Sequence, residues 1–152
     1  MLILSSGITG FLPAPSVKEN TFKQLCYSIF DSRVIDYIGS DPGKNFYECI
    51  VKDKVRNIHI LLNGQYPFIA LTSTREINVH YFPFIDEPEI AKPFKQYYKL
   101  LTPNQLNEPL RYTQQGEQII VINENTLHQN ELIQLVYWEP KTVGDVVFNY
   151  WD

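Results

Sequence analysis

The stretch from residue 33 to residue 82 restricts the fold of this chain most strongly. Runs with apolar side chains at alternate positions follow one another there, separated only by short turn sequences. The pattern predicts strands at 33–39, 45–52, "IHILL", "QYPFIALT" and "INVHYF" (77–82). Connections this short leave no room for crossover helices, so neighbouring strands must run antiparallel. We therefore expect an antiparallel sheet of about five meandering strands.

Turn residues mark the two hairpins of this sheet. Pro42 and Gly43 fit the central positions of a type II turn, and Asn63-Gly64 fits a two-residue type I′ turn. The first turn belongs to "GSDPGKN", whose Gly-Lys pair is also found in phosphate-binding loops. The spacing between the glycines is one residue short, Asn45 replaces the Mg²⁺-binding hydroxyl, and a strand follows instead of a helix. We therefore interpret the stretch as a turn and expect Lys44 to be dispensable for stability.

Outside this region the apolar period becomes helical. Helices are expected at 18–30, at 90–101 with a kink or first-turn position at Pro93, after Thr102, at 129–138 with a strand as the alternative, and at 143–151. Capping boxes are expected at Ser16/Glu19, Thr21/Gln24, Thr102/Gln105 and Thr142/Asp145, and a further hairpin around Gln115-Gly116. The fold class is therefore α+β, with helices packed on the antiparallel sheet.

Composition agrees with one globular domain over residues 1–152. The chain is 44% hydrophobic and 20% charged, and its net charge of −4 disfavours general nucleic-acid binding. Cys26 and Cys49 lie among apolar neighbours, as expected for buried thiols in a reducing compartment. No basic start with a long apolar run indicates a signal peptide, and no run approaches the ~20 apolar residues of a membrane span. A cytoplasmic location without membrane contact is expected.

The titratable residues do not form a recognisable catalytic motif. His59 and His80 lie in expected strands, where a structural role or a shared pocket are both open. His128 and Glu131, three residues apart, resemble half of a di-iron site whose other half is missing. Asp36 and Glu48 are expected to face each other across the first hairpin as solvated carboxylates. We predict no catalytic residue, no cofactor and no metal.

One stretch is a candidate for binding a partner. Lys92, Lys95 and Lys99 are spaced to form a basic stripe on the expected 90–101 helix, with Tyr97 beside them. Basic side chains next to an aromatic ring suit an acidic partner or a phosphate. The alternative is a solvated helix face opposite the core residues Phe94 and Tyr98.

The C-terminal pattern WxPxTxGDxxFNxWD, residues 138–152, resembles the ends of some small uncharacterised cyanobacterial proteins. The resemblance implies a source and supplies no activity. On these grounds we expect a non-catalytic cytosolic protein-interaction or regulatory module, with an immunity-protein-like role within that class and with unknown oligomeric state. The alternative is a small-ligand-binding protein or an enzyme with a pocket containing His59 or His80.

Overall fold

The computed structural model describes residues 2–11, 16–73 and 82–150. Its main sheet has five strands, which lie in chain order: β1 Val34–Ile38, β2 Phe46–Asp53, β3 Arg56–Asn63, β4 Phe68–Ser73 and β5 Lys99–Leu100. The first four strands pair antiparallel, and β5 pairs parallel to β4. The α+β class and the antiparallel meander of β1–β4 are confirmed.

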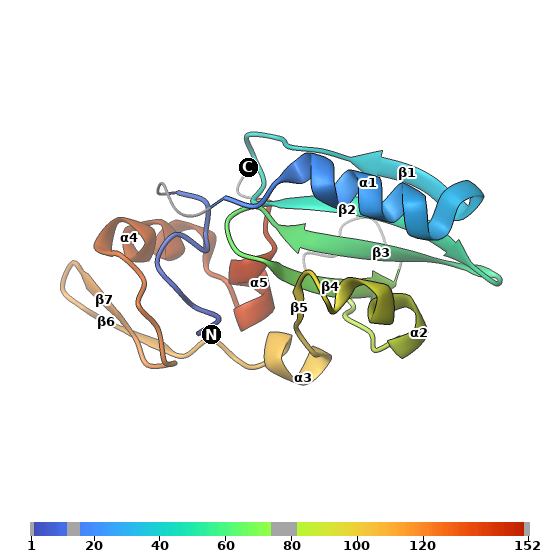
Figure 1. Cartoon of the computed structure of the whole chain (residues 1–152). Coiled ribbons are helices and arrows are strands. Elements are labelled where there is room, and N and C mark those ends of the chain that lie inside the picture. Colours follow the sequence, from blue (N-terminus) through green and yellow to red (C-terminus); the bar gives the residue numbers. More distant parts are fainter. Residues whose placement is uncertain (1, 12–15, 74–81, 151–152) are drawn as a thin grey trace.

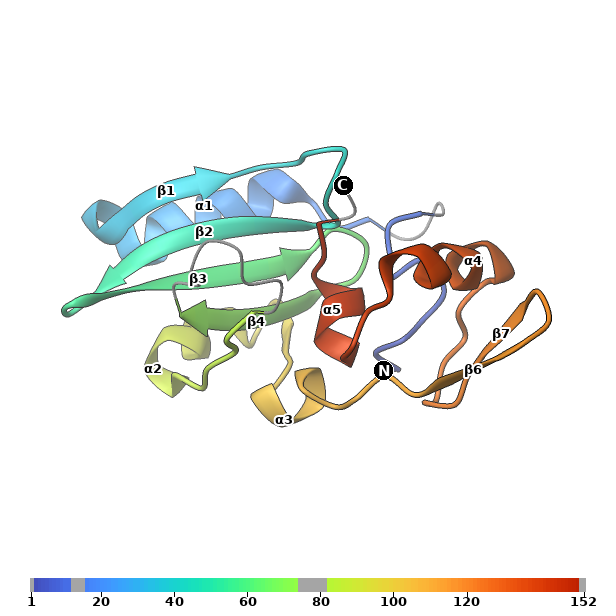
Figure 2. The same ribbon diagram turned by 180° about the vertical axis from the view of Figure 1, so that it is seen from behind.

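Helices and a second sheet complete the fold (Figure 1). They are α1 Glu19–Phe30, the 3-10 helices η1 Asp31–Arg33 and η2 Lys92–Phe94, α2 Pro88–Ala91, α3 Pro103–Leu106, α4 Gln129–Trp138, α5 Val143–Val147, and the hairpin strands β6 Tyr112–Gln115 and β7 Gln118–Val121. The long helix α1 lies across one face of the main sheet, whereas α4, α5 and the β6–β7 hairpin gather at one end of it (Figures 1 and 2).

The alternation of side chains along the strands divides the core into two clusters. Ile60 and Leu62 of β3 point toward α1, where Phe22 and Cys26 are fully buried. Leu61 points to the opposite face and belongs to the cluster that includes Val146 of α5. The second cluster extends from the sheet to β7 and α4, so it holds the end of the molecule in place.

Two buried asparagines join the sheet to the segments at that end. The side-chain amide of Asn45 donates to the carbonyls of Ile8 and Val146, at 3.1 Å each. The side-chain amide of Asn63 donates to the same Ile8 carbonyl at 3.1 Å and to the Val147 carbonyl at 2.7 Å. These bonds satisfy carbonyls at the C-terminal end of α5, which have no partner within the helix.

Both predicted glycine turns are wrong in type, although both hairpins exist. Neither Gly43 nor Gly64 has a positive φ, which type II and type I′ turns require at these positions. Side-chain bonds hold the loops instead: Asp41 Oδ1 accepts from the Gly43 amide at 2.8 Å, and Asn63 Oδ1 accepts from the Gln65 and Tyr66 amides at 2.8 and 2.9 Å. The expected hairpin at Gln115-Gly116 is confirmed, with Gly116 at φ 64°.

The helix predicted over 90–101 is wrong. The chain forms α2 and η2, turns, and enters β5, where the Lys99 amide donates to the Pro67 carbonyl at 2.8 Å. Pro93 has no amide hydrogen to continue the helical ladder, and parallel pairing with β4 offers the following amides a partner. The fifth strand of the sheet is therefore β5. The expected strand at 77–82 lies outside the described residues except for Phe82, which is in no strand.

The other helix predictions are confirmed except at some ends. Residues 129–138 form α4, and the boxes at Thr102/Gln105 and Thr142/Asp145 are present. No capping box begins α1, because its N-cap is Lys18 and makes no side-chain bond. The C-terminal helix ends at Val147 instead of residue 151, and Tyr150 pairs with Lys44 as an isolated β-bridge. Residue 151, the last of the predicted helix, lies outside the described residues.

Candidate interaction site

A cavity of about 490 Å³ lies where the N-terminal segment meets the chain on either side of the β6–β7 hairpin. Its walls carry both apolar and polar side chains: Leu2, Ile3, Leu4, Val143, Glu108, Asn123 and Glu124. Leu4 and Val143 belong to the buried core, whereas Glu108 and Glu124 are exposed. The cavity therefore has an apolar part with two carboxylates among its walls.

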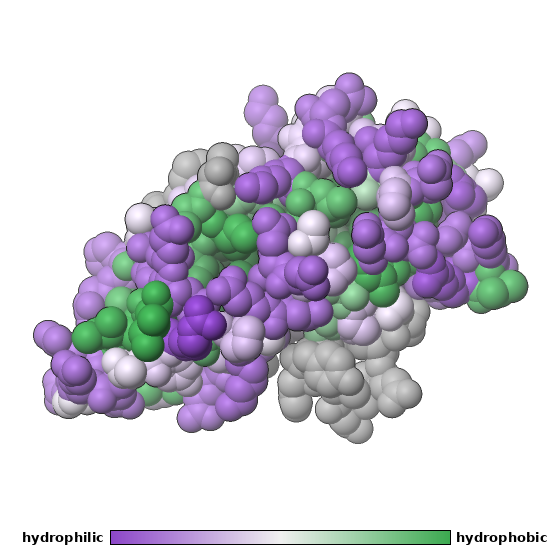
Figure 3. All heavy atoms as spheres, turned by 90° about the horizontal axis from the view of Figure 1, so that it is seen from below, coloured by the Kyte–Doolittle hydropathy of each residue, from purple (hydrophilic) through white to green (hydrophobic). Residues whose placement is uncertain are grey.

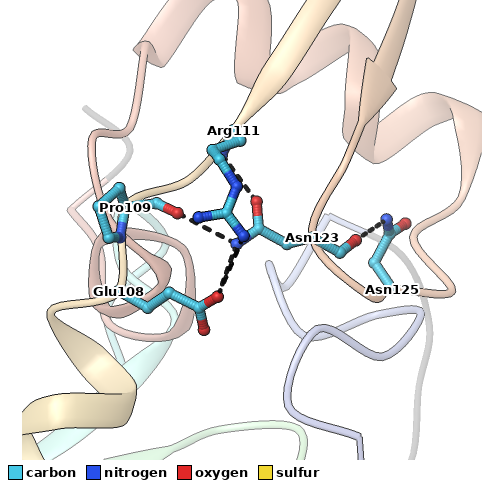
Figure 4. A network of polar contacts seen from close by, with 5 residues as sticks. All are labelled: Glu108, Pro109, Arg111, Asn123 and Asn125. Atoms are coloured by element: carbon cyan, nitrogen blue, oxygen red, sulfur yellow. Dashed lines mark hydrogen bonds and ion pairs between the residues drawn. The ribbon is translucent and has the colours of Figure 1, made fainter.

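Asn123 fixes the polar side of this cavity (Figure 4). Its Oδ1 accepts from the Arg111 amide at 2.7 Å, and its Nδ2 donates to the Pro109 carbonyl at 3.1 Å and to Glu108 Oε1 at 3.3 Å. The Arg111 guanidinium lies 3.6 Å from the same carboxylate oxygen. With every hydrogen bond of the Asn123 side chain used inside the protein, its role is to hold Glu108 and the two chain segments together.

The apolar wall is held by a buried carboxylate in α4. Glu131 is fully buried and accepts from the amides of Gly7 at 2.9 Å and Thr9 at 3.3 Å, and from the Thr9 hydroxyl. It also accepts from the His128 amide at 3.1 Å as part of a capping box. His128 and Glu131 thus begin a helix and anchor the N-terminal segment. No three metal-ligating side chains gather anywhere in the described ranges.

The β6–β7 hairpin and the residue after it carry exposed apolar side chains. Ile119 and Val121 point into the core, so Ile120 and Ile122 point outward, with 46% and 59% of their surface exposed. Figure 3 shows hydrophobic side chains at the surface over this end of the molecule, surrounded by hydrophilic ones. Ile122 directly precedes the cavity residues Asn123 and Glu124. We call Ile120, Ile122 and the cavity together the hairpin face.

Few positive charges offset the two carboxylates of the hairpin face, Glu108 and Glu124. Glu124 makes no hydrogen bond or ion pair with any described residue, and Glu108 is paired only with the half-exposed Arg111. Ion pairs between exposed side chains contribute little energy, so Arg111 does not cancel the attraction of Glu108 for another cation.

Comparison with protein-family models, curated proteins and solved structures finds no match. The resemblance of the C-terminus to cyanobacterial proteins stays a prediction. In the part of the chain that the structure describes, no helix has the length and apolar character needed to cross a membrane.

Sequence reasoning missed the hairpin face because its residues come from four separated segments. No local motif links Leu2, Glu108 and Asn123. One signal was present: the run "IIVI", 119–122, has four branched apolar residues in succession, and a strand can bury only alternate ones against a single core. Two exposed isoleucines follow from that rule.

The predicted basic stripe does not form. Lys92, Lys95, Lys99 and Tyr97 are all exposed, but Lys92 belongs to η2 and Lys99 to β5, so no single helix presents them. Their partner-binding role stays a prediction without the shared helical face that suggested it.

The predicted facing of Asp36 and Glu48 is also wrong. Asp36 pairs with Ile50, and its Oδ1 accepts from the Tyr37 amide. Glu48 is buried, and its Oε2 is hydrogen-bonded to Nδ1 of His59 on β3. His59 pairs in turn with Thr72 of β4, so imidazole and hydroxyl share one face of the sheet. His80 lies outside the described residues.

Two further groups are buried. The thiols of Cys26 and Cys49 are free and buried as predicted, and the pKa of Cys26 is raised by a hydrogen bond with Cys49 and by burial. Lys44 is only 9% exposed, and its expected dispensability for stability stays a prediction. Its Nζ is buried without a hydrogen bond and lies 5.1 Å from the Phe46 ring centre and 5.8 Å from that of Tyr150.

Proposed function

We propose that this chain is a protein-interaction module that binds a partner polypeptide through the hairpin face. The proposal rests on two exposed isoleucines, Ile120 and Ile122, in the chain segment that continues directly into Asn123 and Glu124 of the cavity wall. Exposed apolar side chains ringed by polar ones are typical of surfaces that bind other proteins. A cytosolic regulatory role, including neutralisation of a toxin by an immunity protein, falls within this proposal.

The main support is structural preorganisation. Asn123 and Glu131 use their hydrogen bonds to fix the walls of the cavity, so a partner would meet a surface that is already ordered. A preorganised surface loses less conformational entropy on binding, which favours affinity.

Selection from a random peptide display library tests the proposal. Peptides enriched on the wild-type protein should be lost when Ile120→Ser and Ile122→Ser are combined. They should be retained when Ile35→Ser and Val55→Ser are combined, because these residues are 52% and 99% exposed but lie outside the hairpin face. Enrichment that survives the hairpin variant, with both variants melting near the wild-type temperature, would refute the proposal.

A second candidate function rests on the Glu48–His59 pair. A buried carboxylate hydrogen-bonded to Nδ1 can orient an imidazole as a general base, and Glu48 has this relation to His59. This arrangement favours the alternative of an enzyme with a His59 site, acting in acyl transfer. Hydrolysis of p-nitrophenyl acetate should then be lost in His59→Gln and kept in His128→Gln; equal rates in the two variants would exclude it.

A further inference from the structure

The cavity of the hairpin face has the size of a ligand site. Its volume of about 490 Å³ falls within the range of roughly 300–1,000 Å³ that is usual for pockets that enclose small molecules or side chains. It is far larger than the space that one bound water needs. The cavity can therefore accept a whole side chain of a partner.

The walls favour an occupant that is apolar along its length and polar at its tip. Leu2, Ile3, Leu4 and Val143 provide aliphatic surface, and Glu108 and Glu124 provide carboxylates. Lysine and arginine have this character, because their methylene stems pack on apolar surface while the charged head stays in polar surroundings.

The sign of the charge decides between a basic and an acidic occupant. The described residues that line the cavity include two carboxylates and no cation, and the exposed Arg111 lies 3.6 Å from the carboxylate of Glu108. Asn123 cannot serve an anion, because both donors of its amide are directed to Glu108 and Pro109. An anionic side chain would find repulsion there, and a neutral one would leave Glu124 unpaired.

We infer that the cavity receives a lysine or arginine side chain of the partner polypeptide, with its stem against Leu2, Ile3 and Val143 and its head between Glu108 and Glu124. This inference rests on the proposed function and specifies its partner. The exposed Ile120 and Ile122 would contact apolar residues that flank the basic one. The partner segment is therefore one in which a basic residue lies between aliphatic residues.

Three blocked peptides that differ only in charge test the inference: acetyl-Leu-Lys-Leu-Lys-Leu-amide and its counterparts with glutamine or glutamate in place of lysine. Binding is followed by amide chemical shifts in ¹H–¹⁵N NMR spectra. The lysine peptide should bind the wild-type protein about fivefold more tightly than the glutamine peptide, the size expected for two partly exposed ion pairs. The glutamate peptide should bind most weakly, and added salt should reduce the preference for lysine.

Variants locate the effect. Glu108→Gln with Glu124→Gln should abolish the preference for lysine, whereas Asp86→Asn with Glu89→Gln removes the same charge near and within α2 and should preserve it. Shifts at the hairpin face that are equal for the lysine and glutamine peptides would overturn the inference and leave the proposed function standing. The absence of shifts at the hairpin face with all three peptides would overturn both.

Discussion

Asn45 and Asn149 are joined by two hydrogen bonds. The backbone amide of Asn45 donates to the backbone carbonyl of Asn149 at 3.2 Å, and the backbone amide of Asn149 donates to the side-chain oxygen Oδ1 of Asn45 at 2.8 Å. Asn45 also donates to Ile8 and Val146 from its side chain. A single residue at the start of β2 therefore ties the N-terminal and C-terminal segments to the sheet.

Replacing Asn45 with alanine should be strongly destabilising. The change removes the partners of the Val146 carbonyl and the Asn149 backbone amide and leaves the Ile8 carbonyl with Asn63 alone, at a cost of about 2–4 kcal/mol in the free energy of unfolding. Asn57→Ala, in an exposed position on β3, should cost less than about 0.5 kcal/mol. Urea denaturation of both variants measures the difference, and comparable losses would contradict the role given to Asn45.

The environment of Lys44 predicts a pH dependence of stability. Burial lowers the pKa of its amine below 10.5, an effect that the carboxylates of Glu48, Asp41 and Glu19 partly offset. Between the lowered pKa and 10.5 the unfolded chain binds a proton that the folded chain does not, so the stability contribution of Lys44 rises with pH.

Comparison with Lys44→Met isolates this contribution, since other groups titrate in both proteins. The free energy of unfolding of the wild type, relative to that of the variant, should increase as the pH rises from neutral toward 10.5. A difference that is constant with pH would show that the lysine has an ordinary pKa in the folded state.

Glu131 should be required for the N-terminal wall of the cavity. Glu131→Gln places an amide nitrogen or a neutral oxygen against the Gly7, Thr9 and His128 donors, which should cost about 2–4 kcal/mol. Glu124→Gln removes the same charge at an exposed position and should leave stability within about 0.5 kcal/mol. Glu131→Gln should unfold at a lower temperature than the wild type and show faster hydrogen exchange of the backbone amides in residues 5–9. Unchanged exchange in these residues would contradict the anchoring role of Glu131.

Gly144 lies where the structure leaves no room for a side chain. A Cβ at this position would lie 2.6 Å from Phe84 Cε2 and 2.9 Å from the Leu106 carbonyl oxygen, so Gly144→Ala should cost about 1–3 kcal/mol. At Gly39 the nearest atoms belong to the flexible end of Glu19, so Gly39→Ala should be milder. Equal midpoints of unfolding would contradict the difference.

The sequence predicted those parts of the fold that depend on local patterns. The period of two along residues 45–52 and the helical period along 129–138 depend on neighbouring side chains alone, and both elements are present. The prediction of a helix over 90–101 was wrong because a long-range contact, the pairing of Lys99 and Leu100 with β4, overrides the local helical pattern. The roles of Asn45, Asn63 and Glu131 in joining distant segments were missed for the same reason, because the bonds that join these segments span 37 or more residues.

The candidate site was less predictable than the fold. A cavity depends on which segments meet, and Leu2, Glu108 and Asn123 meet only because Glu131 and Asn123 fix the connections around them. Only the outward direction of Ile120 and Ile122 could be derived from the sequence, through the alternation of β7.

Photocrosslinking from the hairpin face tests whether the partner polypeptide binds there. p-Benzoylphenylalanine is placed at position 122 in one sample and at position 55 in another, and each protein is irradiated with the peptide enriched in display. If the peptide binds the hairpin face, the protein with the photoreactive residue at position 122 should form a covalent adduct with a labelled form of the peptide, and excess unlabelled peptide should abolish this adduct. The protein with the photoreactive residue at position 55 should form no adduct. Adducts from position 55 with none from position 122 would contradict binding at the hairpin face.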